Sequence, residues 1–404
     1  MDKIVIDRTV SHFSGQSENC SISKDKGGTK MKILFAAGGT GGHINPALAV
    51  AGEIRERYPD AEILFVGTKD KMEAKLVPAA GFDFATIDIS GFYRQLTLEN
   101  IKRDIATVFK LLRSSGQAKK ILNDFQPDVA VGFGGYVSGP VIRMAAKLGI
   151  PTAIHEQNAY PGVTNKALAK KVDRVMLTVG DAEKYLEPKN PVTVTGLPVR
   201  GELLRADRDI SRAELGVKDD QLLVLSMGGS LGAEAINKAM VNIIAKHAGN
   251  KKLYFLHSMG QYGLWVPDKL RENGVDPDTF DNVEIREYIS DMDRCMAAAD
   301  LVISRSGASS LSEIEAMGKA AVLIPSPNVA ENHQYHNAMA LVNHDAAVLI
   351  EEKDLTEEKA QEVFDSLIAS PERLRQLGEN ARKIAITDAK TKIADIVLSL
   401  IKQK

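Results

Sequence analysis

Residues 33–46 read ILFAAGGTGGHINP, and this stretch decides the fold class. A short apolar run leads into a glycine-rich turn, and a helical pattern begins after the turn. The arrangement returns about half a chain later in residues 222–233, LLVLSMGGSLGA, with a helical pattern that continues through Ile244. In a parallel α/β sheet, such a turn directs free backbone N–H groups and a helix N-terminus at a ligand beyond the strand. The repetition predicts two α/β domains that face a shared cleft, with an anionic ligand in at least one of them.

From Met31 onwards the chain alternates between strand-like and helical patterns. A first series of strand-like runs covers residues 32–37, 62–66, 84–88, 128–132, 152–155, 174–178 and 192–195. A second series covers residues 222–227, 253–257, 282–285, 301–304 and 320–324. Amphipathic helical patterns lie between them, for example over Ala47–Arg57 and Val141–Leu148. This alternation is typical of βαβ units, whose parallel sheets are covered by helices on both faces.

The chain has 404 residues, more than one ordinary hydrophobic core accommodates, so two domains are expected. A hinge is expected at residues 196–201, GLPVRG, because this segment breaks both the strand and the helical pattern. The last helical pattern, about Ala381–Ile401, is expected to pack back across the hinge. We predict a disordered polar extension, an N-terminal domain, a C-terminal domain and a returning C-terminal helix, over residues 1–30, 31–197, 198–380 and 381–404.

The composition excludes several classes of protein. The net charge is −2, which gives no overall reason to expect nucleic-acid binding. The two cysteines, Cys20 and Cys295, lie far apart in the chain and indicate a reducing compartment rather than a disulfide framework. No apolar run approaches the roughly 20 residues of a transmembrane helix, and the first thirty residues lack the apolar run of a signal peptide.

The first glycine-rich turn does not match other nucleotide-binding motifs. It lacks G-x-G-x-x-G in register, and residues 65–68, FVGT, lack the acidic residue that would hold the ribose of a dinucleotide. No P-loop motif occurs. A metal site is not expected either, because no Asp-x-Asp pair directly ends a predicted strand and the eight histidines are scattered. We therefore predict no cofactor and no metal.

A third phosphate-type segment is residues 301–313, LVISRSGASSLSE. Here a strand runs into a turn of small residues and then a helix, whose first N–H groups and dipole would stabilise a diphosphate. Glu313 lies about one turn into this helix, where a carboxylate can accept two hydrogen bonds from a ribose diol. Ser310 and Glu313 also match a capping box, which needs no ligand, and the spacing alone favours neither interpretation.

Several of these motifs together resemble the MurG family of bacterial N-acetylglucosaminyltransferases. The motifs, in chain order, are GGTGGH at 38–43, GGYVSGP at 134–140, HEQN at 155–158, GGSLGA at 228–233, the segment 304–313 and NHQ at 332–334. The resemblance covers the chain from about Met31 to its C-terminus. It implies a GT-B fold, with two Rossmann-like domains and a deep cleft. It also implies metal-independent, inverting transfer of N-acetylglucosamine from UDP-N-acetylglucosamine to lipid I, which gives lipid II.

Two residues are candidates for the base that takes the proton of the acceptor hydroxyl. We expect Asn45 to cap a helix that begins at Pro46, which places His43 at the positive end of that helix. A histidine there has a lowered pKa, so its neutral imidazole can accept a proton near pH 7. The alternative interpretation is that His43 only forms hydrogen bonds to carbonyl groups of the loop and takes no part in catalysis. Glu156, at the carboxyl end of a predicted strand, is the second candidate, and its alternative is a salt bridge at the rim of the cleft.

The resemblance also implies the substrate contacts. The expected substrate-binding residues are Thr40, Gly41, Gly42, Asn158, Arg200, Ser230, Ile289, Ala308, Ser309, Ser310, Leu311, Ser312, Glu313 and Gln334. Ser230 would cradle the diphosphate, and Ile289 would flank the uracil. Arg200 would neutralise the leaving group, or else form an ion pair between the domains. Tyr136 is expected on the acceptor side.

A membrane surface is a separate prediction. Residues 92–120 contain seven basic and two acidic residues, and apolar residues recur at helical spacing between Ile101 and Leu112. On the sequence alone, a core-facing helix with a solvated charged face is favoured. The resemblance implies a lipid-linked acceptor, and hence peripheral attachment to the anionic inner leaflet at the cytoplasmic face of the membrane. It also makes other cell-wall synthesis proteins expected partners.

Two functions of other classes remain open from the sequence. One is a UDP-sugar epimerase on the same scaffold, which needs no lipid acceptor. The other is a catalytically silent scaffold that binds the membrane and cell-wall proteins. The glycine-rich turns and His43 argue against the silent scaffold.

Overall fold

The first predicted sheet is present and entirely parallel. The computed structural model describes residues 30–89 and 113–401. Their first half forms a seven-stranded sheet of order β3-β2-β1-β4-β5-β6-β7. Its strands are β1 (Lys32–Ala36), β2 (Glu62–Gly67), β3 (Asp83–Thr86), β4 (Val129–Gly132), β5 (Thr152–Glu156), β6 (Arg174–Leu177) and β7 (Thr193–Val194). Each falls within two residues of the predicted run.

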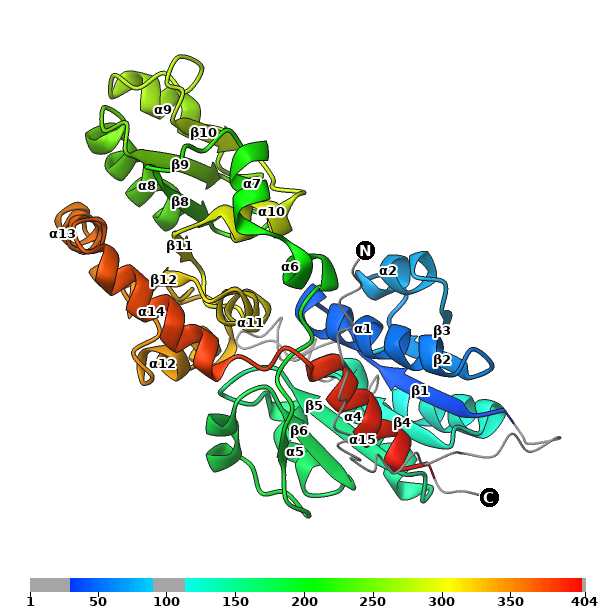
Figure 1. The fold of residues 1–404 in the computed structure, drawn as a ribbon. Helices are drawn as coiled ribbons and strands as arrows, with labels where there is room; N and C mark the ends of the chain where they lie inside the picture. Colours follow the sequence, from blue (N-terminus) through cyan, green and yellow to red (C-terminus); the bar gives the residue numbers. More distant parts are fainter. Residues whose placement is uncertain (1–29, 90–112, 402–404) are drawn as a thin grey trace, which may run out of the picture. The chain divides into compact units, whose positions relative to one another are not determined.

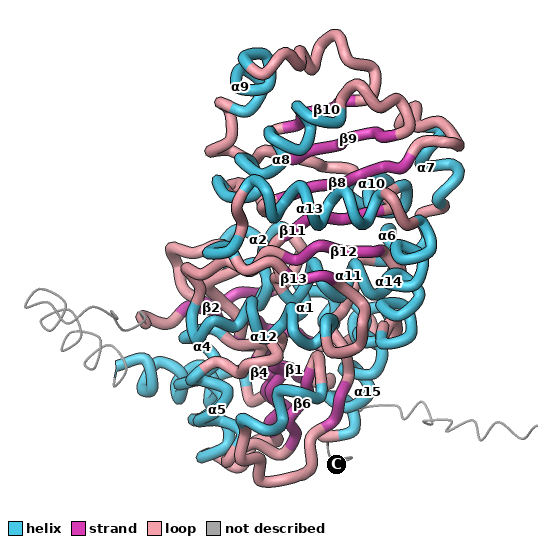
Figure 2. Tube along the Cα trace, turned by 90° about the vertical axis from the view of Figure 1, so that its left-hand side faces the viewer, coloured by secondary structure: helices cyan, strands magenta, loops and turns pink. Residues whose placement is uncertain are grey.

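The second sheet is also parallel and has six strands in the described part of the chain, in the order β10-β9-β8-β11-β12-β13. Figure 2 shows them in this order. The strands are β8 (Leu222–Met227), β9 (Leu253–Ser258), β10 (Val283–Arg286), β11 (Leu301–Ser304), β12 (Ala320–Leu323) and β13 (Val348–Leu349). The two-residue strand β13 is too short to give a sequence signal, and the sequence analysis missed it.

Helices cover both faces of each sheet. Those of the first half are α1 (Gly41–Arg57), α2 (Glu73–Ala79), residues 113–125, α4 (Gly135–Lys147), α5 (Val163–Ala169) and the 3₁₀ helix η1 (Gly180–Tyr185). Those that follow are α6 (Gly201–Arg205), α7 (Arg208–Glu214), α8 (Glu234–His247), α9 (Val266–Glu272), α10 (Met292–Ala298), α11 (Ala308–Met317), η2 (Ala330–Asn332), α12 (His333–Val342), η3 (Glu352–Asp354), α13 (Glu357–Ile368), α14 (Pro371–Ile384) and α15 (Ala389–Ser399).

Successive side chains of each strand pack alternately into the hydrophobic clusters on the two faces of its sheet. In β1, Ile33 and Phe35 belong to one cluster of buried side chains, and Leu34 and Ala36 belong to another. Successive side chains of a strand point to opposite faces, so both faces of this sheet are buried. The second sheet is buried in the same way. Together, the two sheets and their helices form the α/β, two-domain, GT-B-like fold that the resemblance implied.

Helix α1 begins earlier than predicted. Its N-cap is Thr40 rather than Asn45, and Pro46 lies inside the helix. The Thr40 carbonyl accepts hydrogen bonds from the backbone N–H groups of His43 and Ile44, so the glycines at the end of the turn already form the first helical turn. Pro46 is the sixth residue of this helix and has no N–H to donate to the carbonyl of Gly42, so one i→i−4 hydrogen bond is missing there. His43 therefore lies within the first turn of α1.

The predicted last helix is two helices. Helix α14 ends at Ile384, Ala385 has extended backbone angles, and α15 begins at Ala389. Helix α15 lies beside α1 in the first half of the chain (Figure 1). Its buried side chains, Ile393, Ala394 and Val397, join a core cluster of the first sheet.

Ion pairs add to this packing between α1 and α15. Lys390 Nζ lies 2.9 Å from Glu53 Oε2, and Arg57 Nη1 lies 2.5 Å from Asp395 Oδ1. These pairs lie at the surface, so the apolar contacts supply most of the stabilisation.

Some predictions concern residues outside the described ranges. The extension over residues 1–29 and most of the basic and aromatic stretch, residues 92–112, are among them. In residues 30–89 and 113–401, no helix has both the length and the apolar character needed to cross a membrane.

The contribution of α15 to the first sheet is testable by truncating a buried side chain. Ile393→Ala should lower the free energy of unfolding by about 2–4 kcal/mol, because the cavity forms inside a shared core. Lys392→Ala, an exposed position on the same helix, should change it by less than about 0.5 kcal/mol. Urea unfolding followed by circular dichroism measures both. Equal effects of the two substitutions would contradict the packing described.

Candidate active site

Three loops of the first half meet because their strands are neighbours. Strands β1, β4 and β5 are adjacent in the sheet, so the segments that follow them lie at the same edge. These segments are the first glycine-rich turn, residues 133–135 and the HEQN motif at 155–158. Carboxyl ends of parallel strands are where α/β proteins bind ligands. The structure thus brings together three of the predicted motifs.

Glycines allow the loops to touch. A Cβ atom on Gly135 would lie 2.2 Å from the carbonyl oxygen of Gly38, and Gly135 has φ of +76°. A Cβ on Gly134 would lie 2.8 Å from Cδ2 and 3.0 Å from Nε2 of His43. The imidazole of His43 therefore packs directly against the backbone of residue 134, where only glycine leaves enough space.

The hydrogen bonds of His43 fix its tautomer. Nδ1 lies 3.1 Å from the carbonyl oxygen of Gly38, which can only accept, so Nδ1 carries the proton. Nε2 is then the atom with a free lone pair. Burial is the largest influence on the pKa of His43 and lowers it below its usual value. The bond to Gly38 and the charges of Glu156 and Glu73 oppose this lowering, whereas His333 adds to it.

The carboxylate of Glu156 is occupied by its own loop. It accepts hydrogen bonds from the backbone N–H of Asn158 at 2.9 Å and of Gly162 at 3.1 Å. The side-chain amides of Asn158 and Asn165 donate to it at 3.3 Å and 2.8 Å. The side chain is only 2% exposed. This arrangement holds the loop after β5 in place and differs from the salt bridge considered as an alternative.

In the second half, the two phosphate-type segments also end adjacent strands. Strands β8 and β11 pair, with Met227 opposite Ser304, so the GGSLGA turn and the turn at 304–308 are neighbours. The GGSLGA turn packs on the loop after β9, because a Cβ on Gly232 would lie 2.2 Å from the carbonyl oxygen of Met259. Ser230 is exposed, and its carbonyl oxygen accepts a hydrogen bond from the backbone N–H of Gln261 at 3.3 Å.

The capping-box interpretation of the 301–313 segment is wrong. Helix α11 begins at Ala308 with Gly307 as its N-cap, and no side chain caps it. Ser310 therefore lies within the first turn. Glu313 accepts a hydrogen bond from Nε of Arg200 at 2.8 Å. The two residues that the resemblance assigned to the diphosphate and the ribose are thus paired with each other.

One asparagine that the sequence analysis missed joins the two halves. Asn337 Oδ1 accepts from the backbone N–H of Ala159 at 2.7 Å. Its Nδ2 lies 3.1 Å from Asn158 Oδ1 and 3.2 Å from the carbonyl oxygen of Ser306. Asn337 lies one turn into α12, close after the NHQ motif, but nothing local in the sequence indicates a partner 179 positions away.

The remaining predicted residues occupy varied environments. Gln334 Oε1 accepts from the backbone N–H of Ser326 at 2.9 Å, which leaves its amide N–H groups for a ligand. Ile289 is buried, whereas Tyr136 is 55% exposed on α4. Nδ1 of His333 donates to the carbonyl oxygen of Ala330 at 2.8 Å. Within the described residues, no group of three His, Cys, Asp or Glu side chains is placed to hold a metal ion.

Comparison with known proteins identifies the family. Residues 33–177 match the glycosyltransferase family 28 N-terminal domain, and residues 223–396 match the C-terminal domain of that family. Curated relatives named UDP-N-acetylglucosamine–N-acetylmuramyl-(pentapeptide) pyrophosphoryl-undecaprenol N-acetylglucosamine transferase are 43% identical in Acetivibrio thermocellus and 45% identical in Thermoanaerobacter pseudethanolicus. The alignments cover 93% and 92% of this chain and 99% and 100% of the relatives. The chain belongs to this transferase family.

A solved structure of the family agrees with the fold. The crystal structure of MurG from Acinetobacter baumannii matches with a TM-score of 0.76 and 28% identity. The match covers 92% of this chain and all of the other. The resemblance inferred from the motifs is therefore confirmed, and the chain is a hexosyltransferase of the MurG family.

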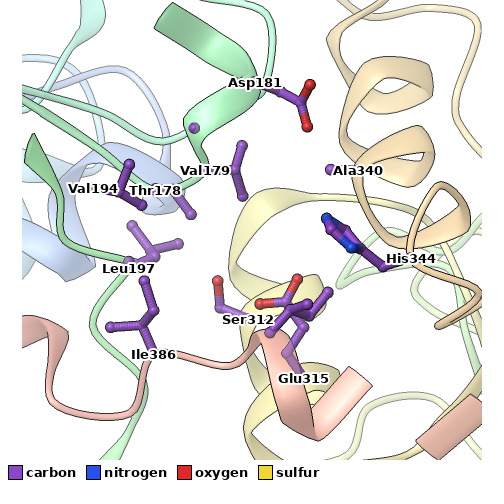
Figure 3. Close-up of a pocket in the computed structure, with 13 residues that line it drawn as sticks. Thr178, Val179, Asp181, Val194, Leu197, Ser312, Glu315, Ala340, His344 and Ile386 are labelled. Carbon is purple, nitrogen blue, oxygen red and sulfur yellow. The ribbon is translucent and has the colours of Figure 1, made fainter. Parts of the chain in front are cut away.

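The transferase also has a pocket beside the segments that connect its two halves. Its walls come from residues after β6 and β7, from α11 and α12, and from the link between α14 and α15. Figure 3 shows the carboxylate of Glu315 and the imidazole of His344 directed into this space, with Leu197 and Ile386 on the opposite wall. Ser312 is the predicted site residue in its lining. Burial raises the pKa of Glu315 to about 8.

The raised pKa of Glu315 predicts a pH-dependent stability. Its usual value is 4.5, so between about pH 4.5 and 8 the folded transferase binds a proton that the unfolded chain has released. The contribution of Glu315 to stability is therefore present below this window and is lost as the pH rises through it. Across this window, Glu315→Gln should gain about 2–4 kcal/mol in free energy of unfolding relative to the wild type.

Urea unfolding at pH 5, 7 and 9 measures this difference. Glu379→Gln, on the exposed face of α14, should follow the wild-type pH dependence. Parallel curves for Glu315→Gln and the wild type would show that Glu315 is ionised in the folded transferase.

Proposed function

We propose that this chain transfers N-acetylglucosamine from UDP-N-acetylglucosamine to lipid I, which gives lipid II. The observation that carries the proposal is the 43–45% identity, over more than nine-tenths of the chain, to relatives named for this reaction. The meeting of all the motifs at the carboxyl ends of two parallel sheets supports it. A UDP-sugar epimerase would need no acceptor, and nothing in the site favours it.

The second half supplies the donor site in this proposal. The uncapped N-terminus of α11, Ala308–Ser310, offers backbone N–H groups and a positive dipole end to the diphosphate. The GGSLGA turn lies beside it and would contact the same group through Ser230. Glu313 would exchange its bond to Arg200 for the ribose hydroxyls, which would free the guanidinium for the diphosphate. Leu311 and Ser312 continue this turn, Ile289 would flank the uracil, and Gln334 would bind the sugar.

The first half supplies the acceptor site and the base. Nε2 of His43 would take the proton from the attacking hydroxyl of lipid I as its oxygen bonds to the anomeric carbon. The bond between that carbon and the diphosphate breaks, and UDP leaves from the opposite face with inverted configuration at the sugar. Thr40, Gly41, Gly42 and Asn158 would line the site, and Tyr136 would face the acceptor. The helix terminus and Arg200 stabilise the leaving charge, so the proposed reaction needs no metal.

The two candidate bases differ in whether the atoms that would accept the proton already accept hydrogen bonds. Glu156 accepts four hydrogen bonds from its own loop, so taking a proton would break the structure that positions Asn158. The free lone pair of His43 Nε2 carries no such cost. The bonding pattern therefore supports His43 as the base and Glu156 as the residue that orders the loop.

Substitution of the two residues tests the assignment. His43→Ala should lower kcat by about 100- to 10,000-fold, the usual range for a general base, while the KM for the donor changes less than about threefold. Glu156→Gln should lower kcat by less than about tenfold. Because the pKa of His43 is lowered, wild-type activity should decline only below the usual histidine range as the pH falls. A larger loss in Glu156→Gln than in His43→Ala would reverse the assignment.

The reaction itself is tested by measuring UDP release from UDP-N-acetylglucosamine. Release should require a short-chain lipid I analogue and should persist in the presence of a chelator. Release of UDP, or epimerisation of the donor, without the acceptor would favour the epimerase. Tight UDP binding with no turnover would favour the silent scaffold.

We also propose that the enzyme binds the cytoplasmic face of the membrane peripherally, because its acceptor is lipid-linked. Its basic and aromatic stretch would provide the contact with anionic lipid. Replacing Phe92, Tyr93, Arg94 and Lys102 by neutral polar residues should weaken binding to anionic vesicles at least about tenfold. Lys238→Gln with Lys269→Gln, in the second half, should leave binding unchanged. Undiminished binding by the first variant would rule out this surface.

A further inference from the structure

Glu73 is a completely buried carboxylate beneath the first glycine-rich turn. It is 0% exposed and lies at the start of α2, next to the carboxyl end of β2. Oε1 accepts hydrogen bonds from the backbone N–H of Thr68 at 3.0 Å and from its hydroxyl at 2.7 Å. Oε2 accepts from the backbone N–H of Gly39 at 3.1 Å. These neutral donors meet the requirement of a buried carboxylate for hydrogen bonds.

The turn is built around this carboxylate. A Cβ atom on Gly38 would lie 2.7 Å from Glu73 Oε1, and a Cβ on Gly67 would lie 2.5 Å from Glu73 Cγ. The side chain of Glu73 thus fills the space that two glycines leave. A side chain at either glycine would displace the carboxylate from the bonds it makes.

One peptide group connects Glu73 to His43. The N–H of Gly39 and the carbonyl of Gly38 belong to the same peptide bond. The N–H donates to Glu73, and the carbonyl oxygen accepts from Nδ1 of His43 at 3.1 Å. A negative charge at the N–H end increases the negative partial charge on the carbonyl oxygen, because hydrogen bonds in series polarise one another.

We infer that Glu73 is a positioning residue for sugar transfer, acting on His43 through the Gly38–Gly39 peptide group. The carboxylate holds the peptide so that its carbonyl keeps the proton on Nδ1, which directs the free lone pair of Nε2 towards the acceptor. It also stabilises the imidazolium that forms when Nε2 takes the proton. The inference rests on the proposed function, in which His43 is the base.

The sign of the effect follows from the charges that face His43. Glu156 and Glu73 raise the pKa of His43, and His333 lowers it. Glu73→Gln removes one of the two negative charges. Its amide oxygen can still accept from Thr68, but its NH₂ group would then meet the N–H of Gly39. The pKa of His43 should fall, and the acid limb of the pH–kcat profile should move to lower pH.

The test is a double-substitution cycle on the full chain with the soluble acceptor analogue. Glu73→Gln should lower kcat about 10- to 100-fold, with the donor KM changed less than about threefold and the acid limb displaced. In the His43→Ala background, the same substitution should cost less than about twofold. Glu53→Gln, which removes a carboxylate from the far end of α1, should leave kcat and the profile unchanged.

Two results would overturn the inference. One is an unchanged pH profile and kcat in Glu73→Gln. The other is an equal loss with and without His43, which would make Glu73 a purely structural support. If His43→Ala alone keeps the wild-type kcat, His43 is not the base and the proposed mechanism fails. The single variant of the cycle therefore distinguishes that failure from failure of the role inferred for Glu73.

A measurement on the wild-type protein covers the case in which Glu73→Gln does not fold. ¹⁵N NMR of histidine-labelled protein should show His43 as the Nδ1-protonated tautomer. The amide proton of Gly39 should shift as His43 titrates. The opposite tautomer, or a Gly39 amide that does not respond, would contradict the connection through the peptide.

Discussion

Close backbone contact between neighbouring loops is the constraint on which the site depends. In the first half, Gly135 touches the carbonyl of Gly38, and in the second half a Cβ on Gly260 would lie 2.1 Å from the backbone nitrogen of Gly232. No side chain fits at either contact, so the strand-end loops approach more closely than any other residue type would allow. The carbonyl that touches Gly135 also binds His43. Backbone packing therefore sets the position of the imidazole. A larger residue at Gly38 or Gly135 would separate the two loops and displace His43 as well.

In the proposed reaction, the two halves divide the charges that transfer would produce. The first half places His43 beside two buried carboxylates, Glu73 and Glu156, which favour a positive charge on the imidazole. The second half presents the N-terminus of α11 and the guanidinium of Arg200, which favour a negative charge. In the proposed reaction, proton uptake makes the imidazole of His43 positive, and the departing UDP carries the negative charge of its diphosphate. In this proposal, the charged groups favour transfer of the sugar from a donor bound in the second half to an acceptor bound in the first.

The sequence predicted the parallel strands well and the helix ends poorly. Buried strands are continuous apolar runs, and this signal is local, so the twelve predicted runs lie within two residues of observed strands, whereas the two-residue β13 was missed. Helix ends depend on backbone geometry that several residue types satisfy. The glycines before His43 form the first turn of α1, and Gly307 caps α11 without a side chain. The break after Ile384 contains neither glycine nor proline, so no local signal marks it.

The site was predicted as a set of motifs but not as a network. The motifs converge because adjacent parallel strands end at one edge, which follows from the topology. Glu73 and Asn337 were missed because the partners that connect them to the site, Gly39 and Asn158, are 34 and 179 positions away. These long-range contacts form only after the sheets and helices have assembled, whereas the bonds of Glu73 to Thr68 are local. The sequence analysis gave an ion pair as one alternative for Arg200, but nothing in the sequence indicates that Glu313, 113 positions away, is its partner.

The return of α15 to the first sheet affects how the protein is made. The core cluster that contains β1 and α1 also contains Ile393, Ala394 and Val397, near the other end of the described chain. During synthesis, the strands of the first half leave the ribosome long before these residues are translated. Until then, the apolar surface of α1 that α15 covers remains open to water. The first half therefore cannot complete its folding before the second half has been synthesised.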